Sequence, residues 1–522
     1  MLPCLRPSSV HRRPLLALQL LCVVQGCERF AFFTMLPLFV LYLHHRHRFA
    51  ESSSLLGLGV FQALSYVGGL PASWLADRRL GAVAATLIGA AALALGYGGL
   101  ALDQAALLWP ALALMVVGHS FFKPSIHVLL ADVSGDSDAQ RERSFLWHYL
   151  AINLGCLVAP TLAEWVQARH GWATLFGVAT AASVVGVAVL VLMARGLQAH
   201  HLQREAIPQT VSDQTAPGSM RAVRLICSVA VVFWLTSQQA SSSLMLLAAE
   251  NTLLHGQVLQ WTIELGPGHF SSLHALMVVS LLPMFLALNK RRHPSAPSST
   301  ASKMVWGYVA TAAAFAVLSA AGLSGADTGR VSPLWLVGSY ALLSLAELLL
   351  APLGVSLLTQ LAPKQRANQA VGLWFAATAA GNLLGGVLGL LWERWPHHRY
   401  FGLVAMLSLV AAAVLLLGLR GLDPLLAHRA AAALQPQLSS TAHGMSKTAT
   451  ALPYASWVLP SLAVVLPVPL IVLSSLPLPL RAVGAIGSGL AVLLCGSHLI
   501  ARAIDGVTAI VTSQLPGNSH CS

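Results

Sequence analysis

The chain has 522 residues, of which 56% are hydrophobic and only 9% are charged, and its formal net charge is +12. A soluble domain usually has about 25% charged residues, so this composition excludes a water-soluble protein of such length. The basic residues lie mostly in short segments between apolar runs, which is typical of the positive-inside bias of membrane proteins and not of nucleic-acid binding. The sequence therefore predicts an all-α protein that crosses the lipid bilayer many times.

Apolar segments of about 20 residues, the length that crosses a bilayer, recur along the chain. Six are predicted in the first half, at 14–43, 53–76, 82–102, 107–131, 144–167 and 172–194. Six more are predicted in the second half, at 225–248, 270–288, 305–322, 334–361, 370–392 and 401–419. The segment between the halves is rich in charge, proline and serine, which indicates a linker. We therefore expect a six-helix bundle at 1–196, a linker at 197–222 and a second six-helix bundle at 223–424.

The basic loops alternate along the chain. The amino-terminal segment with Arg12 and Arg13, the loops "ADRRLG" and "NKRRH", and the linker all fall on one side of the predicted membrane. Lys and Arg are enriched in cytoplasmic loops. We therefore expect a multi-pass protein of the cell membrane whose amino terminus and central linker are cytoplasmic.

The segment 425–522 has a different character. The run "WVLPSLAVVLPVPLIVLSSLPLPL" is apolar and long enough to span, but it contains several prolines, each of which removes a helix hydrogen bond. The run "AVGAIGSGLAVLLCGSHLIA" is a cleaner candidate. We interpret this tail either as one or two additional spans or as an extension with little regular structure.

The sequence shows no clear metal-ligand or nucleophile pattern, and it therefore gives little support for an enzyme. The seven cysteines are scattered, with no zinc or disulfide spacing. The run "HHRHR" at 44–48 is a possible metal site, although such a run is more often a solvated loop. We therefore expect no metal, no cofactor and no catalytic residue.

Four charged residues stand inside apolar runs: Glu28, Arg29, Lys123 and Glu347. A charge at the bilayer centre costs about 2.5–3.5 kcal/mol on insertion scales, so such groups usually face a cavity or a partner. They are two cations and two carboxylates, drawn from both halves. One interpretation is a set of structural ion pairs between helices. The other, which the complete set favours, is the wall of a solute path.

The first of these charges lie on a polar stripe. Gln25, Glu28 and Arg29 are spaced i, i+3 and i+4, which places them on one helix face. The small residues Gly26 and Cys27 allow another helix to approach closely. This pattern is typical of a helix that lines a cavity.

Several segments together resemble the proton-dependent oligopeptide transporters of the major facilitator superfamily. "QGCERFAFF" is similar to that family's first-helix motif, and "GLPASWLADRRLG" to the loop after the second helix. "GHSFFKPSI" and "RSFLWHYLAINLGCLVAP" resemble the motifs of helices four and five. "FWLTSQQASSSL", "FSSLHALMVVSLLP", "LAELLLAPLG" and "VGLWFAATAAGNLLGG" resemble helices seven, eight, ten and eleven. The resemblance runs from about residue 15 to residue 419 and implies two six-helix bundles.

The resemblance also implies a substrate site. Arg29 and Lys123 would bind a peptide carboxylate, and Glu347 its amino group. The other implied substrate-binding positions are Asn153 for the peptide backbone, Tyr66 and Trp374 for side-chain pockets, and Gln25, Gln238 and His274. Gating or structural roles would fall to Asp77, Arg78 and Gly81 after the second helix and to Pro124 and Pro352 in helices four and ten.

The chain departs from the family pattern at several of these positions. Gln25 stands where the family has its first Glu, and Phe32 and Phe33 replace two Tyr. A charged Arg–Glu pair of many members appears as Leu36 and Gln238. Losing both members of a pair is tolerable, whereas losing one would strand a buried charge at about 3–5 kcal/mol.

Histidines stand near several of these positions. His274 replaces an Asn of helix eight, and His119 and His127 flank Lys123. An imidazole is able to titrate near neutral pH. Taken singly, each is more often a histidine with its hydrogen bonds satisfied at a helix interface.

These observations predict a secondary transporter that works by alternating access about a midplane site. The expected cargo is a di- or tripeptide, and the expected driving ion is the proton, with Glu28, Glu347 and His274 as coupling residues. Two alternatives remain open. The chain is either a carrier for another small zwitterion or anion, uncoupled or differently coupled, or a membrane sensor or scaffold that does not transport.

Overall fold

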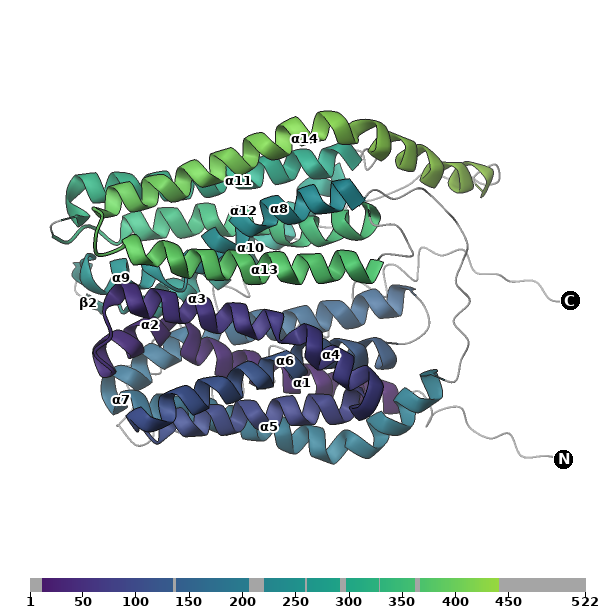
Figure 1. The fold of residues 1–522 in the computed structure, drawn as a ribbon, viewed down its shortest axis with the longest axis horizontal. Helices are drawn as coiled ribbons and strands as arrows, with labels where there is room; N and C mark the ends of the chain where they lie inside the picture. The colour runs from purple at the N-terminus through teal and green to yellow at the C-terminus, as the bar shows by residue number, and fades with distance from the viewer. Residues whose placement is uncertain are drawn as a thin grey trace, which may run out of the picture. The chain divides into compact units, whose positions relative to one another are not determined.

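The computed structural model describes residues 12–134, 138–205, 220–258, 261–291, 297–327, 329–361 and 367–440 (Figure 1). Residues up to Gln437 form one compact unit. The two extra spans considered for the tail beyond Ser440 lie outside the described residues.

The first half begins with α1 (Arg12–Met35), which continues through a 3-10 turn, the short α2 (Phe39–Leu41) and a π turn that ends at Arg46. The helices that follow are α3 (Glu51–Val67), α4 (Gly69–Leu75), α5 (Ala82–Ala101), α6 (Leu108–Val133) and α7 (Asp138–Glu205). The last of these is two helices joined at Gly171, whose φ of 79° and ψ of −178° are not helical. Gly171 falls between the predicted spans 144–167 and 172–194, so that boundary is where the sequence predicts it.

The second half is also mainly helical. Its elements are α8 (Met220–Gln239), α9 (Ser243–Glu250), α10 (Pro267–Arg291), α11 (Pro297–Ala321), α12 (Leu334–Leu361), α13 (Ala367–Leu388) and α14 (His397–Ser440). A hairpin of two short antiparallel strands, β1 (His255–Val258) and β2 (Trp261–Glu264), connects α9 to α10. This hairpin and the continuation of α14 past the expected end at 419 were not expected from the sequence.

The membrane-spanning character of the chain is confirmed. Ten helical segments of the described chain are long and apolar enough to cross a bilayer, and one of these, 151–198, contains both parts of α7. The predicted span 270–288 coincides with α10, which has 25 residues. Large apolar side chains project from many helices, among them Leu192 at 86% exposure and Leu95 at 65%. Lipid is the environment in which such exposed helix faces are stable.

Helix contacts within the compact unit join both neighbouring and distant parts of the chain. In the first half α1 packs on α7 and α5 on α6, and in the second half α11 packs on α12 and α8 on α13. The two halves meet where α3 lies beside α13 and where α7 lies beside α10 (Figure 1). These two seams position the polar groups described below.

The seam between α3 and α13 depends on glycine. A Cβ added to Gly59 would lie 2.6 Å from the Cα of Gly386 and 2.7 Å from the carbonyl oxygen of Asn382. Both neighbours are backbone atoms, which cannot rotate away. Small residues at a membrane helix interface allow this close approach.

A Gly59→Val substitution is therefore expected to force α3 and α13 apart. Overpacking of this kind costs about 1–3 kcal/mol. Thermal unfolding of the purified protein measures the loss. Gly177→Val is the matched control, because a Cβ at Gly177 meets nothing within 4 Å. Equal unfolding temperatures for the two variants would contradict the close approach.

Candidate functional site

A buried ion pair lies in the second half of α1. Arg29 Nε and Nη2 donate hydrogen bonds to the two carboxylate oxygens of Glu28, each at 2.5 Å. Gln25 Nε2 donates to Glu28 Oε2 at 3.3 Å. The side chains of Glu28 and Arg29 are 6% and 13% exposed. The structure thus brings the predicted stripe together, and the two-pronged Arg contact compensates a carboxylate that is costly to bury.

Two aromatic rings support the cations of this site. The guanidinium carbon of Arg29 lies 4.8 Å from the centre of the Phe32 ring, and Lys123 Nζ lies 5.4 Å from the same centre. Lys123 Nζ is also 4.3 Å from the centre of the Tyr66 ring. Cations are attracted to the electron-rich faces of such rings. Phe32 therefore holds two cations near one another without the hydroxyl that a Tyr would have.

The helix α7 links this ion pair to the second half. Asn153 is buried on α7. A Cβ on the next small residue, Gly155, would lie 3.0 Å from the Cβ of Arg29, so α7 and α1 are in close contact. On another side, α7 packs on α10 of the second half.

A second carboxylate contact joins α10 and α12. His274 Nε2 lies 3.3 Å from Glu347 Oε2. The His274 ring packs against Tyr340, with ring centres 5.5 Å apart. The Glu347 side chain is 39% exposed, against 6% for Glu28. Glu347 is therefore the more open of the two carboxylates.

An aromatic cluster crosses from the first half to the second. The Tyr66 ring centre lies 6.4 Å from those of Trp234 on α8 and Phe375 on α13. Trp234 is 6.3 Å from Trp374, which is buried. A Cβ on Gly354 would lie 2.7 Å from the Trp374 ring, so α12 leaves room for that indole. Tyr66 and Trp374, predicted for side-chain pockets, belong to one cluster.

Gln238 on α8 is a neutral contact between helices. It is buried, and a Cβ on Gly385 of α13 would lie 2.1 Å from its Oε1. Gln239 Nε2 donates to Gln238 Oε1 at 3.4 Å. Leu36, named with Gln238 as a departure from the family pattern, is also buried.

Three of the predicted gating or structural positions lie in the turn between α4 and α5, and the other two are prolines within helices. Asp77 and Arg78 are exposed after α4, and the Arg78 guanidinium lies over the Trp74 ring at 4.8 Å. Gly81 has a φ of 75°, which favours glycine, and it separates this turn from α5. Pro124 lies inside α6. Pro352 lies within α12, in a stretch whose side chains are not described.

Glu28 also borders a small cavity within the first half. The cavity is lined by residues of α1, α5, α6 and α7, namely Val24, Glu28, Ala90, Leu93, Phe122, Ser183 and Gly186. Ser183 Oγ and Gln25 Oε1 are buried and have no hydrogen-bond partner among the described residues. Buried polar atoms usually have a partner. The cavity is mainly apolar, with Glu28 and Ser183 as the polar residues of its lining.

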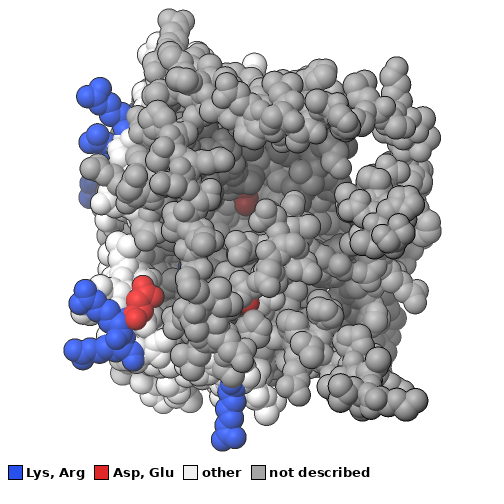
Figure 2. Space-filling model, turned by 90° about the vertical axis from the view of Figure 1, so that its right-hand side faces the viewer, with Lys and Arg blue, Asp and Glu red and all other residues white. Residues whose placement is uncertain are grey.

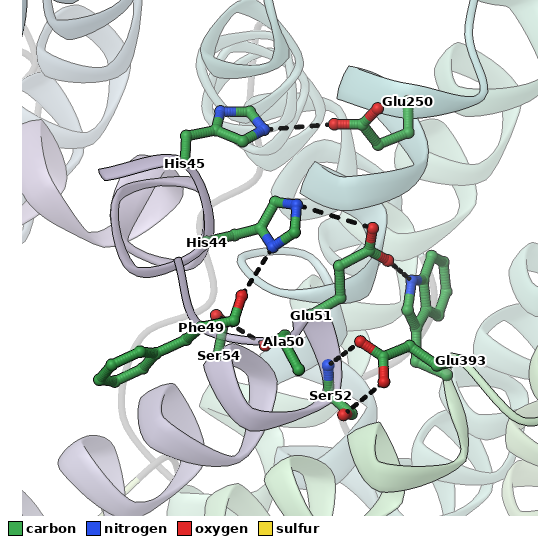
Figure 3. Close-up of polar contacts among 10 residues, drawn as sticks. His44, His45, Phe49, Ala50, Glu51, Ser52, Ser54, Glu250 and Glu393 are labelled. Atoms are coloured by element: carbon green, nitrogen blue, oxygen red, sulfur yellow. Dashed lines mark hydrogen bonds and ion pairs between the residues drawn. The ribbon is translucent and has the colours of Figure 1, made fainter. Parts of the chain in front are cut away.

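Polar contacts also join the two halves at one end of the helices, which we call the closed end (residues 44–52, 250 and 392–393). Ser52 donates from its backbone N–H and its hydroxyl to the Glu393 carboxylate, at 3.3 and 2.9 Å (Figure 3). Trp392 Nε1 donates to Glu51 Oε2 at 2.6 Å. Both contacts tie the start of α3 to the segment after α13.

Two histidines complete the closed end. His45 Nε2 lies 3.3 Å from Glu250 Oε1 at the end of α9, and His44 Nε2 lies 3.9 Å from Glu51 Oε1 (Figure 3). His44 Nδ1 lies 2.8 Å from the carbonyl oxygen of Phe49, which fixes the ring. The "HHRHR" run, considered as a metal site in the sequence analysis, thus makes contacts with carboxylates here. No group of metal-ligating side chains is found among the described residues.

The opposite end of the helices is basic. The helical segment 51–80 carries Glu51 at the closed end and Arg78 and Arg79 at its other end. Arg221 and Arg224 are exposed at the start of α8, whose continuation α9 ends at the closed end. Figure 2 shows Lys and Arg side chains along the described part of the face toward which α4 extends. The two ends of the helices therefore differ in charge.

The carboxylates of the closed end and the role of Phe32 were not expected from the sequence. Glu51, Glu250 and Glu393 all stand at the edges of apolar segments, and that shared placement was an available signal. The contacts of Phe32 with two cations depend on how α1 and α6 pack, which no local pattern shows.

Membrane-spanning helices in two halves, each with a carboxylate inside an apolar helix, are the arrangement expected of a transporter of the major facilitator class. Solved structures have this fold. A mutant of a peptide transporter POT in complex with sulfate superposes with a TM-score of 0.67 at 25% identity, covering 78% of this chain and 95% of that one. A POT family transporter in complex with 5-aminolevulinic acid gives a TM-score of 0.68 at 20% identity, which shows the fold alone.

The model of the POT family matches residues 80–216 and 198–400. These matches cover more than half of the chain, and the chain belongs to the POT family. It is 29% identical to the peptide transporter YePEPT of Yersinia enterocolitica, over 69% of this chain and 85% of that protein. It is 24% identical to the dipeptide and tripeptide permease A of Escherichia coli, over 72% of this chain and 84% of that protein.

Replacement of Phe32 by Leu tests the aromatic support. The variant keeps an apolar side chain but removes the ring face beneath Arg29 and Lys123, and each cation–ring contact contributes about 0.5–2 kcal/mol. We expect a lower unfolding temperature than for Phe33→Leu, because the neighbouring ring contacts Phe32 edge-on and no described cation. Equal losses in the two variants would show that only packing volume matters.

Replacement of Glu51 by Gln tests the closed end. The variant removes the charge that faces His44 and weakens the bond from Trp392, and hydrogen bonds to charged groups contribute about 1.5–3 kcal/mol. We expect a cysteine placed at Leu55, which is buried on α3, to react faster with a membrane-impermeant maleimide. Asp103→Asn is the control, because Asp103 contacts Arg46 within the first half. An unchanged rate in Glu51→Gln would exclude a closing role.

Proposed function

We propose that the chain takes up di- and tripeptides together with protons by alternating access. One observation carries the proposal: Arg29 and Lys123 share the Phe32 ring in the first half, and Glu347 stands beside His274 in the second. A peptide zwitterion offers a carboxylate to the two cations and an ammonium to the carboxylate, and both attractions are strong where water is excluded. The names of the peptide transporter and permease relatives support this substrate class.

The proposed substrate contacts follow from the positions of these groups. The peptide carboxylate binds Arg29 and Lys123, and the amino group binds Glu347 once His274 releases it. The remaining contacts are Asn153 for the peptide backbone, Tyr66 and Trp374 for the side chains, and Gln25, Gln238 and His274 as neutral polar neighbours. A guanidinium suits a carboxylate because its two N–H groups match the two oxygens.

The proposed sidedness rests on charge. The basic end, with Arg78 and Arg79, faces the cytoplasm together with the amino terminus and the linker, because Lys and Arg accumulate on that side. The closed end then faces outside. In this proposal the two moving bodies are the bundles at 1–196 and 223–424, and contacts such as Ser52–Glu393 form when the outer path closes.

Coupling is proposed to act through the pair of Glu28 and Arg29. The pair occupies both carboxylate oxygens. A substrate carboxylate competes for the same guanidinium, and when Arg29 turns toward it the buried Glu28 charge loses its partner. An unpaired buried charge is costly, so proton uptake accompanies substrate binding.

An uncoupled carrier is the second candidate. Gln25 stands at a position where relatives carry a carboxylate, and as an amide it only donates to Glu28. With one titratable group fewer on α1, substrate exchange without net proton movement is the expected behaviour of this candidate.

Transport by purified protein in liposomes separates these functions. Under an inward proton gradient, we expect labelled dialanine to accumulate and to be accompanied by an electrical current. Glu28→Gln should lower this accumulation roughly tenfold, equivalent to about 1.4 kcal/mol of driving force, while counterflow exchange at equal pH is retained. Gln25→Glu should make uptake more steeply dependent on pH.

Three other results of these transport measurements would favour a different coupling residue or a different function. Accumulation by Glu28→Gln at the level of the parent would move coupling to His274 or Glu347. Exchange without any pH dependence would favour the uncoupled carrier. Absence of both exchange and binding would favour the sensor or scaffold.

A further inference from the structure

A histidine from another helix lies against the buried ion pair. His119 on α6 is 0% exposed, and its Nδ1 lies 3.3 Å from Glu28 Oε1. The rings of Phe32 and Phe61 cover it, with ring centres at 4.9 and 6.1 Å. Neither of its ring nitrogens has a partner at hydrogen-bond geometry among the described residues, although Nδ1 lies close to the Glu28 carboxylate. A buried polar group without a partner is costly, so packing alone does not explain a histidine here.

Glu28 accepts hydrogen bonds from its own helix, and His119 approaches it from α6. Arg29 donates to both oxygens, and Gln25 donates to Oε2. His119 approaches Oε1 from the opposing helix. Among these neighbours the imidazole is the group able to take up a proton near neutral pH. The amide of Gln25 cannot do so, and the guanidinium of Arg29 is always charged.

Charge balance predicts the order in which Arg29, Glu28 and His119 change during substrate binding. While Arg29 is paired with Glu28, the pair is neutral and a second cation beside it is unfavourable, so His119 is neutral. When a substrate carboxylate draws Arg29 away, the Glu28 charge is left in a buried site. A proton that adds to His119 then restores neutrality at Glu28. One proton thus enters for each carboxylate bound.

The other charged or titratable groups near His119 are few. Lys123 lies four residues further along α6 and rests on Phe32 and Tyr66. Tyr97 on α5 is buried and interacts electrostatically with Glu28. From α3 the ring of Phe61 contacts the imidazole. Lys123 opposes a proton on His119 until its charge, like that of Arg29, is met by the substrate carboxylate.

We propose that His119 is a proton-carrying residue of this transporter and occupies the role left open by Gln25 on α1. The inference rests on the proposed function, because the substrate carboxylate is what separates Arg29 from Glu28. It adds a coupling residue on α6 to those expected on α1, α10 and α12.

The first test is proton-driven accumulation of dialanine in liposomes with His119→Gln. A gradient of about one pH unit drives roughly tenfold accumulation for each coupled proton, so we expect accumulation to fall about tenfold. His127→Gln is the matched control, because that ring is exposed on the same helix and bonds the Lys123 carbonyl oxygen. Adding Gln25→Glu to His119→Gln should restore accumulation, which also shows that the variant folds. Accumulation by His119→Gln equal to that of the parent would overturn the proposal.

The second test needs no transport. Nuclear magnetic resonance of the protein in lipid, with isotope-labelled histidine, identifies the His119 signal by its loss in His119→Gln. Arg29→Gln removes the guanidinium from Glu28, and the signal should then change from neutral imidazole to imidazolium at pH 7. A signal that stays neutral would overturn the proposal. If it changes while the parent moves no dipeptide, the proposed function fails and the assignment of His119 stands.

Discussion

The arrangement depends on one carboxylate that is buried among apolar helices. Glu28 is stable there because Arg29 occupies both of its oxygens and Gln25 donates to one of them. The free-energy cost of removing an ion from water is offset only when such contacts are well aligned. Any group that competes for Arg29 therefore changes the energy of Glu28, and the neighbouring helices respond to the same charge.

Two kinds of polar or aromatic contact join the halves of the protein, one buried and one at the closed end. Inside, the Phe32 ring brings Arg29 and Lys123 together, and Tyr66 carries the contact on to Trp234 and the second half. At the closed end, carboxylates that are partly exposed bond to a serine, an indole and two histidines. The inner contacts are shielded from water and the end contacts are not. Salt screens the exposed contacts far more strongly than the buried ones.

The sequence predicted the membrane-spanning helices and the polar stripe of α1, because each is a local property of composition or helical spacing. The grouping of Gln25, Glu28 and Arg29 is confirmed by their contacts. The sequence did not predict the His119 contact with Glu28 or the bond between Trp392 and Glu51, which join residues 91 and 341 positions apart. Such contacts depend on how helices pack. The hairpin after α9 was not predicted, because its two strands are too short to show a clear alternation of apolar and polar residues.

The aromatic cluster between the halves has an optical consequence. Trp234 and Trp374 are neighbours of Tyr66 and Phe375, which belong to opposite halves. The Trp234 indole Nε1 is buried without a hydrogen-bond partner among the described residues. Indole emission shifts in wavelength when water or a donor–acceptor partner reaches the ring. Two of the chain's 13 tryptophans therefore stand at the contact between its halves, and their emission is expected to change if that contact opens.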